Sequence, residues 1–311
     1  MGTDSPRGRI LVTGAGGQVG GALVRTLTGL GEVVAPERAV LDLADAGTIR
    51  RVMQEVKPRW VVNAGAYTAV DKAESEPELA RAINGMAPGV LGEEARKVGA
   101  AVVHFSTDYV FDGTKEEPYV ETDATGPLNV YGATKLEGEL ALAGSGAAHL
   151  IFRTSWVYGA TGKNFLRSMA RMAREREVLR IVSDQHGAPT WSEELARMTA
   201  RVIAWVEEKT TEGELSEAVI PVAGVYHATG TGETTWFGFA QAVVEELRGL
   251  EPEAKLARVE PITTLEYPTP AKRPTNSRLD CGKLERTFGW RMPEWRESVK
   301  RVTAELALGA L

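Results

Sequence analysis

The first half of the chain alternates short apolar runs with stretches of helical periodicity. The runs occupy residues 10–13, 33–35, 60–63, 101–106 and 150–155, and the helical stretches occupy residues 19–30, 46–56, 78–98 and 130–142. The runs are continuously apolar instead of alternating with polar residues, which is typical of parallel strands buried on both faces. Strands that alternate with helices in this way predict a doubly wound α/β domain.

After about Tyr158 the pattern changes. Helices are expected at residues 164–176, 192–208 and 235–247, with Ser192 as the N-cap of the second, and strands at 181–182 and 225–228. A polar connection follows at 207–217, and the tail at 267–278 is rich in proline and basic residues. We therefore expect residues 1–158 and 191–229 to form the first domain. Residues 159–190 and 230–311 would form a second, smaller α+β domain that holds the substrate.

Charge and cysteine content narrow the class of protein. The 311 residues include 36 Lys and Arg against 42 Asp and Glu, a net charge of −6, which disfavours nucleic acid as a partner. Cys281 is the only cysteine and the four histidines show no metal-ligand spacing, so we expect no disulfide and no metal site. The polar opening at residues 1–8 and the lack of a long apolar stretch favour a cytoplasmic protein that is not bound to a membrane.

A glycine-rich segment follows the first predicted strand directly. Gly14, Gly17 and Gly20 are spaced as GxxGxxG, with Gln18 and Val19 between the last two, and an apolar helix comes next. A strand–glycine–helix junction lets backbone N–H groups and the helix dipole approach a pyrophosphate without side chains in the way. The position of this segment predicts dinucleotide binding in a fold of Rossmann type.

The end of the second predicted strand carries two charged residues with opposite preferences. Arg38 suits the 2′-phosphate of NADPH, whereas Glu37 suits the free 2′-hydroxyl of NADH. Of the two cofactors, NADPH is favoured, and NADH is kept as the alternative.

Tyr131 and Lys135 are the strongest candidates for chemistry. Residues four apart on a helix share one face, so the phenol and the ammonium are expected in one site, where the cation would lower the pKa of the phenol. The preceding strand ends in Ser106 and Thr107, at the edge where open α/β sheets bind ligands. The combination indicates a proton donor at a ligand-binding edge of the sheet.

These segments together resemble the extended short-chain dehydrogenase/reductase family, and within it the reductases of 4-keto nucleotide sugars. The likeness spans nearly the whole chain and rests, besides the glycine motif, on the runs at residues 63–71, 106–111, 127–132, 153–159, 184–190 and 267–274. It implies an oxidoreductase that uses a nicotinamide cofactor to reduce the C4 ketone of a nucleotide sugar. It leaves open whether the protein forms a homodimer.

The resemblance also implies roles for individual residues. Thr107 would hold the ketone oxygen, Tyr131 would protonate it, and Lys135 would tune Tyr131 and bind the nicotinamide ribose. The other implied cofactor contacts are Asp42 and Leu43 at the adenine, and Asn63, Ala64, Gly65, Ala66 and Tyr67 beside the cofactor. The implied substrate contacts are Asp108, Tyr109, Trp156 and Asn164.

Three basic residues of the tail complete the expected substrate site. Lys272, Arg273 and Arg278 concentrate positive charge in an acidic chain, and guanidinium groups suit the oxygens of a diphosphate. Two alternatives stay open. One is another nucleotide-sugar enzyme of the extended family, an epimerase or a dehydratase. The other is a cofactor-binding regulatory subunit that resembles the one of methionine adenosyltransferase.

Overall fold

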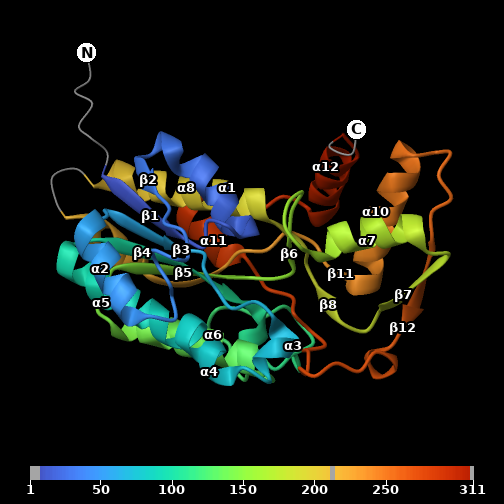
Figure 1. Ribbon diagram of the computed structural model, residues 1–311, viewed down its shortest axis with the longest axis horizontal. Coiled ribbons are helices and arrows are strands. Elements are labelled where there is room, and N and C mark those ends of the chain that lie inside the picture. The colour runs from blue at the N-terminus through green and yellow to red at the C-terminus, as the bar shows by residue number, and fades with distance from the viewer. Residues whose placement is uncertain (1–7, 211–213, 309–311) are drawn as a thin grey trace, which may run out of the picture.

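A six-stranded parallel sheet forms the centre of the protein, whose computed structural model describes residues 8–210 and 214–308 (Figure 1). The polar start of the chain, residues 1–7, lies outside the described residues. The strands run in the order β10-β5-β4-β3-β1-β2. Their bounds are β1 Arg9–Thr13, β2 Glu32–Val34, β3 Trp60–Asn63, β4 Ala101–Thr107, β5 His149–Thr154 and β10 Gly224–His227.

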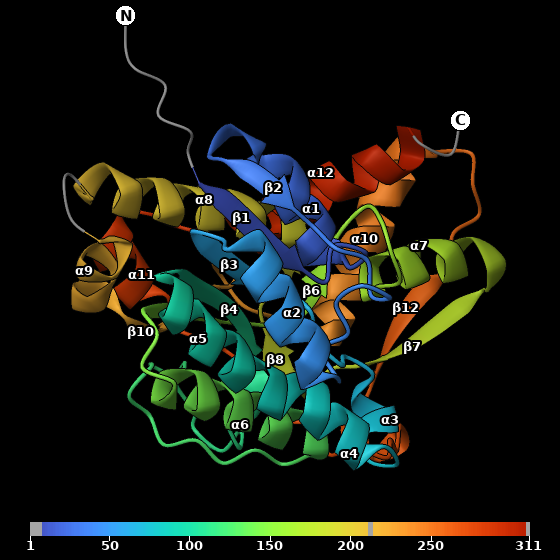
Figure 2. The ribbon, with the colours of Figure 1, turned by 60° about the vertical axis from the view of Figure 1, so that its left-hand side comes forward.

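Helices cover both faces of this sheet, as the apolar runs require. Ile10 and Val12 point into the layer below helices α1 (Gln18–Thr26) and α8 (Ser192–Lys209), whereas Leu11 points into the opposite layer. That opposite layer is covered by α2 (Ala46–Val56), α5 (Ala87–Val98) and α6 (Val130–Gly144), which Figure 2 shows on the far side of the strands from α1 and α8.

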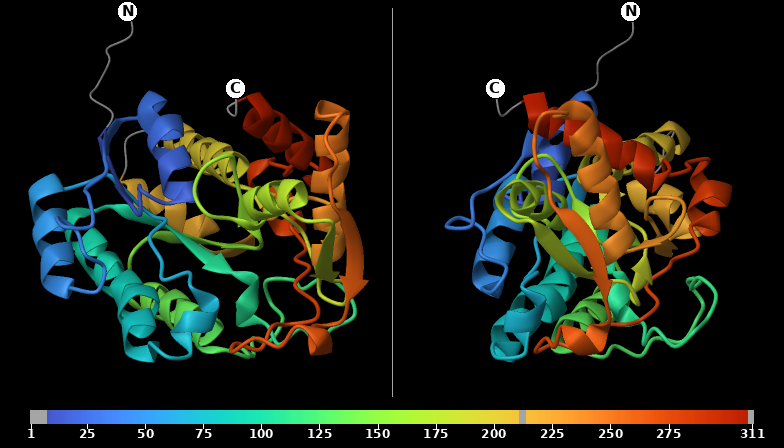
Figure 3. Two further views of the ribbon diagram at one scale, coloured as in Figure 1. Left: turned by 45° about the vertical axis from the view of Figure 1, so that its right-hand side comes forward. Right: turned by 90° about the vertical axis from the view of Figure 1, so that its right-hand side faces the viewer.

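A second lobe packs beside the carboxyl edge of the sheet. Its core is formed by helices α7 (Phe165–Glu175), α10 (Trp236–Leu250) and α12 (Trp295–Leu308) together with the parallel pair β7 (Val178–Val182) and β12 (Arg258–Ile262) (Figure 3). Helix α11 (Gly282–Phe288) belongs instead to the first core, because Leu284 and Phe288 pack with α8 and β10. The end of the chain therefore returns to the first lobe before α12.

Short elements connect these layers. They are η1 Leu27–Gly29, α3 Val70–Ala73, α4 Pro77–Ala80, the π-helix η2 Arg81–Met86, η3 Asp108–Val110, β6 Val157–Tyr158, β8 His186–Gly187, β9 Thr190–Trp191, α9 Leu215–Val219, η4 Ile220–Val222, β11 Thr234–Thr235 and η5 Thr264–Glu266. None of the helices in residues 8–210 and 214–308 is long and apolar enough to cross a membrane.

The predicted Rossmann-type α/β class, with its smaller α+β lobe, is confirmed. Two local predictions are wrong. Ser192 is the first residue of α8 and not its N-cap, because β9 extends to Trp191 and leaves Ser192 packed against Gly159. The long helix expected at 78–98 is divided into α4, a π-helical segment and α5. The division into domains at 158, 190 and 229 stays a prediction.

Candidate active site

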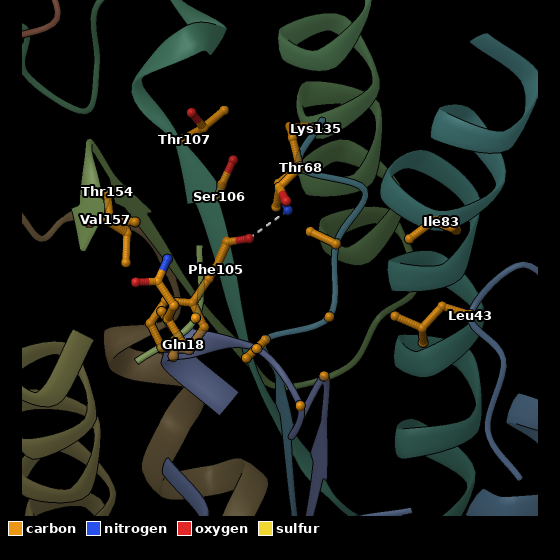
Figure 4. A pocket seen from close by; sticks show the side chains of 18 of the residues that line it. Gln18, Leu43, Thr68, Ile83, Phe105, Ser106, Thr107, Lys135, Thr154 and Val157 are labelled. Atoms are coloured by element: carbon orange, nitrogen blue, oxygen red, sulfur yellow. Dashed lines mark hydrogen bonds between the residues drawn. The ribbon is translucent and has the colours of Figure 1, made fainter. Parts of the chain in front are cut away.

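A cavity of about 900 Å³ opens at the carboxyl edge of the sheet, where the two lobes meet (Figure 4). Its walls are the loop between β1 and α1, the ends of β3 and β4, the first turns of α6, and two tryptophans near the second lobe, Trp156 and Trp236. The direction of strand succession reverses between β1 and β3, so the cavity lies at the topological switch point where open α/β sheets bind ligands.

The glycine loop has no room for side chains at two positions and open space at a third. Gly14 has φ of +68°, and a Cβ there would lie 2.6 Å from the backbone of Gly65. A Cβ on Gly20 would lie 2.0 Å from the carbonyl oxygen of Gly14, whereas one on Gly16 would meet nothing within 4 Å. Within residues 8–210 and 214–308, no side chain caps the N-terminus of α1. Free N–H groups beside open space fit the pyrophosphate of a dinucleotide.

The opposite end of the cavity is lined by charged residues after β2. Arg38 lies 3.8 Å from Asp42, its side chain is 74% exposed, and Glu37 and Leu43 line the same region. This long, loose ion pair leaves the guanidinium accessible to a ligand. The predicted region for the adenosine ribose therefore carries one accessible cation and two carboxylates.

Helix α6 brings Tyr131 and Lys135 to the end of β4. Asn129 caps the helix by accepting a hydrogen bond from the Gly132 N–H at 2.8 Å. Gly132 lets the helix approach η3 closely, because a Cβ there would lie 2.1 Å from the carbonyl oxygen of Tyr109. As a result both Tyr131 and Lys135 line the cavity, as the helical spacing predicts.

The lysine ammonium bonds to strand β4 and not to the tyrosine. Lys135 Nζ donates to the carbonyl oxygen of Phe105 at 2.6 Å (Figure 4) and lies 3.2 Å from His104 Nε2. Burial lowers the pKa of Lys135 to about 8, although the carboxylate of Glu139 acts in the opposite direction. Burial also raises the pKa of Tyr131 to about 12, with the nearby Thr107 hydroxyl opposing. The expectation that Lys135 lowers the pKa of Tyr131 is therefore not met, because desolvation dominates.

Polar side chains at the end of β4 face the same cavity. The Thr107 hydroxyl donates to the Asp108 carboxyl at 3.0 Å and accepts from the Tyr109 N–H at 3.2 Å. Burial raises the pKa of Asp108 to about 6. The buried hydroxyls of Ser106 and Thr154 line the cavity without a hydrogen-bond partner among residues 8–210 and 214–308. Such groups are normally paired, so they indicate a polar ligand at this wall.

Two stacked tryptophans form the wall nearest the second lobe. The rings of Trp156 and Trp236 lie 3.8 Å apart at 16°. Trp156 has a left-handed backbone with φ of +47°, which is uncommon for a bulky residue and typical of functional sites. Trp236 was not predicted as a site residue, because in the sequence it appears only as an apolar residue at the start of a helix.

Most of the predicted site residues line the cavity. Those that line it are Gly14, Gly17, Gln18, Val19, Arg38, Asp42, Leu43, Ala64, Gly65, Ala66, Thr107, Asp108, Tyr109, Tyr131, Lys135 and Trp156. Those that the structure places elsewhere are Gly20, Asn63, Tyr67, Asn164, Lys272, Arg273 and Arg278. Lining residues that the sequence did not single out include Phe105, Thr154, Lys163 and Trp236.

The residues outside the cavity have partners that explain their positions. The side chain of Asn63 is used within the core, and the Tyr67 hydroxyl donates to Glu76 at 2.6 Å. Asn164 caps α7, and its amide donates to the Gln18 side chain at 2.9 Å. Asn164 therefore ties the second lobe to the glycine loop. Its predicted contact with substrate stays a prediction.

Two of the three basic residues singled out in the tail, Arg273 and Arg278, form ion pairs. Arg273 pairs with Asp71 at 2.8 Å, and Arg278 pairs with Glu233 at 2.7 Å. The backbone carbonyl of Lys272 accepts a hydrogen bond from Asn129, the cap of α6. The tail thus contacts both α3, through Asp71, and the N-cap of the helix that carries Tyr131, whereas its contact with a substrate diphosphate stays a prediction.

The fold and the cavity together define a dinucleotide-dependent oxidoreductase of the extended short-chain dehydrogenase/reductase class. The glycine loop and the cavity fit the cofactor, and the Tyr131–Lys135 pair beside a strand-end threonine fits the chemistry. Comparison with known proteins narrows this class.

A family model described as "RmlD substrate binding domain" matches residues 8–308. A dTDP-4-dehydrorhamnose reductase of Burkholderia thailandensis is 50% identical over 293 residues, covering 94% of this chain and 96% of that protein. The crystal structure of a dTDP-4-dehydrorhamnose reductase from Clostridium acetobutylicum has 37% identity and a TM-score of 0.85, covering 96% of this chain and 99% of the other. The Bacillus anthracis enzyme, solved in complex with NADP, has 32% identity, the same TM-score and the same coverage. The chain belongs to the dTDP-4-dehydrorhamnose reductase family.

Proposed function

We propose that this protein reduces the C4 ketone of dTDP-4-dehydro-β-L-rhamnose to give dTDP-β-L-rhamnose, the last step in making this nucleotide sugar, with NADPH as its cofactor. The observation that carries the proposal is the meeting of Thr107, Tyr131 and Lys135 in one cavity that continues into the glycine loop. Relatives that match nearly the whole chain bear the name of this reductase, which supports the choice of substrate.

The cofactor would be held along the length of the cavity. The N–H groups at the start of α1 would bind its pyrophosphate, and Arg38 would face the 2′-phosphate that distinguishes NADPH from NADH. NADPH supplies the hydride that the carbonyl carbon accepts. The relative solved with NADP supports this preference, and NADH remains a second cofactor that Glu37 would suit.

The protein's own residues would polarise and protonate the carbonyl oxygen. Tyr131 is fully protonated at neutral pH, because its pKa lies near 12, so its phenol is ready to donate a proton. The Thr107 hydroxyl would turn from Asp108 toward the ketone oxygen and hold it beside the phenol. The ammonium of Lys135 adds positive charge near the oxygen on which negative charge develops.

The sugar nucleotide would occupy the end of the cavity nearest the second lobe. Ser106 and Thr154 offer unpaired hydroxyls there, and the stacked pair of Trp156 and Trp236 offers an aromatic surface. Hydroxyls suit the hydroxyl groups of a sugar, and aromatic rings suit its apolar faces or a base. These two features favour a nucleotide sugar over a smaller ketone.

The alternatives have less support. A dehydratase would want two carboxylates near Thr107 for elimination. Among the residues lining the cavity, Asp108 is the carboxylate at this end, whereas Glu37 and Asp42 lie at the other. A regulatory subunit would bind cofactor without turnover, so an activity assay separates it from a reductase.

The test is an assay of reduced-nicotinamide absorbance with purified protein, NADPH and dTDP-4-dehydro-β-L-rhamnose. The wild-type protein should consume NADPH, and Tyr131→Phe should lower kcat by about 10²- to 10⁴-fold while leaving the Kd of NADPH nearly unchanged. Tyr119→Phe is the matched control, because this buried tyrosine bonds to Asp112 outside the cavity. Turnover by Tyr131→Phe at the wild-type rate would refute the assignment of the proton donor, and absence of turnover by the wild type would refute the function.

A further inference from the structure

A continuous chain of hydrogen bonds runs beneath the cavity and ends at Lys135. The Gly65 N–H donates to the Thr13 hydroxyl at 3.1 Å, and that hydroxyl lies 2.6 Å from Asn63 Oδ1. The other end of the Asn63 amide lies 2.9 Å from His104 Nδ1, and His104 Nε2 lies 3.2 Å from Lys135 Nζ. The four side chains belong to β1, β3, β4 and α6, and each is at most 2% exposed. Thr13, Asn63 and His104, which do not line the cavity, therefore depend on protein partners instead of solvent.

The imidazole in the middle of this chain is neutral and has one donor and one acceptor. Burial, together with the positive charge of Lys135, lowers the pKa of His104 well below its usual value. When Nδ1 accepts from the Asn63 amide, Nε2 carries the hydrogen and faces Lys135 as a donor. That arrangement suits a neutral lysine amine. An ammonium needs the opposite arrangement, in which Nε2 accepts and Nδ1 donates.

The chain accommodates this second arrangement through the rotation of one side-chain amide. The Asn63 amide can turn by 180°, which presents its oxygen to His104 Nδ1–H and its NH₂ to the Thr13 hydroxyl. The Thr13 oxygen still accepts the Gly65 N–H in both states. Each protonation state of Lys135 therefore has its own complete set of partners for His104 and Asn63.

Lys135 lies in the range where both states matter. Its pKa falls to about 8 because of burial, and the groups that face it are His104 on β4, Glu139 one turn further along α6, and the carbonyl oxygen of Phe105. Glu139 is itself held by Arg153 at 2.6 Å, in a pair that is almost fully buried. His104 is thus the one uncharged side chain that bonds directly to the Lys135 amine among the hydrogen bonds found in residues 8–210 and 214–308.

We propose that His104 is a positioning residue for the Tyr131–Lys135 pair, and that Asn63 and Thr13 switch its tautomer so that it holds the lysine amine in either charge state. This inference rests on the proposed function, in which Lys135 must stay charged and in place beside Tyr131. Without Nε2, the buried ammonium would keep the Phe105 carbonyl but lose its other uncharged partner. A buried cation that loses a partner gives up its proton more easily.

Two substitutions of His104 separate this role from simple packing. In His104→Gln a polar group reaches the position of Nε2 and can accept from Lys135, whereas in His104→Asn it reaches only the position of Nδ1 and Asn63. We expect the activity of the wild type to fall as pH rises through the pKa of Lys135. In His104→Asn this fall should move to lower pH by about one unit, a loss of about fivefold at pH 8, because the hydrogen bond lost by the ammonium is roughly twice as strong as the one lost by the neutral amine. His104→Gln should stay close to the wild-type profile.

The matched control is His227→Asn. His227 is equally buried, on β10, and its Nδ1 lies 3.1 Å from the Tyr119 carbonyl oxygen, away from Lys135. This variant should lose thermal stability without moving the pH profile. If His104→Asn keeps the wild-type profile, or if His104→Gln moves as far as His104→Asn, the inference is wrong. Absence of turnover by the wild-type protein would instead refute the proposed function, so the two failures are distinguishable.

A measurement on the wild-type protein covers the case in which His104→Asn does not fold. The chain has four histidines, so a ¹⁵N-histidine spectrum is simple, and the signal absent from His104→Gln identifies His104. His104 should remain neutral between pH 6 and pH 10, and its hydrogen should move from Nδ1 to Nε2 as Lys135 loses its proton. A single tautomer throughout this range, or an imidazolium, would overturn the proposal.

Discussion

Burial is the dominant influence on the residues that would perform the reaction. It raises the pKa of Tyr131 to about 12 and lowers that of Lys135 to about 8. The spacing of these residues, four apart on a helix, correctly predicts a shared cavity, but it contains no information on how deeply they are buried. For a reductase the outcome is favourable, since the phenol must be protonated when the carbonyl oxygen gains negative charge.

Arg38 is the residue that would distinguish the two cofactors. Its guanidinium is accessible, with Asp42 at 3.8 Å as a weak partner. We expect Arg38→Ala to raise the Kd of NADPH about tenfold and to change that of NADH less than twofold, since only NADPH carries the 2′-phosphate. Fluorescence titration with both cofactors measures this difference. Arg50→Ala, which removes an arginine paired with Glu94 outside the cavity, is the control. Equal losses for the two cofactors would show that Arg38 does not contact this phosphate.

Some helices and strands can be predicted from the sequence, and others cannot. Strands β1, β3, β4 and β5 and helix α2 are predicted almost to the residue, because their apolar runs are continuous and bounded by turn residues. Strand β12 is not predicted, because Pro261 and the exposed Arg258 interrupt its apolar pattern. Its pairing with β7, seen in the structure, identifies it as a strand. The π-helical segment η2 is not predicted either, because the helical pattern at residues 78–98 runs across it without a break.

The tail at residues 267–278 shows the same limit for the site. Its basic residues are visible in the sequence, but their partners Asp71 and Glu233 are far away in the chain and become evident only in the structure. Arg273 thus has two roles to distinguish: it holds α3 through Asp71, and it would bind the substrate diphosphate.

A pair of variants separates these roles. Arg273→Ala should raise the KM for the sugar nucleotide about tenfold with little change in the Kd of NADPH, because it removes a cation that would bind the diphosphate. Asp71→Asn breaks the same ion pair but keeps the cation, so its KM should stay near the wild-type value or fall. Steady-state kinetics at low and high salt measure both. Equal increases of KM in the two variants would mean that the ion pair is structural only.

Across the whole molecule, the cavity joins two lobes that would bind different ligands. The first lobe supplies the glycine loop and the residues at the ends of β3 and β4, whereas helix α10 of the second lobe supplies Trp236, which stacks on Trp156. Sequence patterns could assign the first lobe in detail because its glycine motif is local. They could not find Trp236, since its role depends on contact between segments 80 residues apart.

Trp236→Ala tests whether the two lobes bind different ligands. Loss of an aromatic stacking surface typically costs about 1–3 kcal/mol, so the KM for the sugar nucleotide should rise roughly fivefold to a hundredfold. The Kd of NADPH should stay within about twofold, because the glycine loop is untouched. Trp205→Ala is the control, since this tryptophan packs on Phe288 away from the cavity and should affect only thermal stability. A large loss of NADPH affinity in Trp236→Ala would show that the second lobe also holds the cofactor.

The most direct measurement follows the hydride itself. The protein would be incubated with dTDP-4-dehydro-β-L-rhamnose and NADPH that carries deuterium at both hydrogen positions of C4 of the nicotinamide ring, and the product would be examined by NMR and mass spectrometry. The structure and the family together predict dTDP-β-L-rhamnose with one deuterium bound to C4 of the sugar. A product without deuterium at C4, deuterium at another carbon, or oxidation of NADPH with no rhamnose formed would contradict the proposed function.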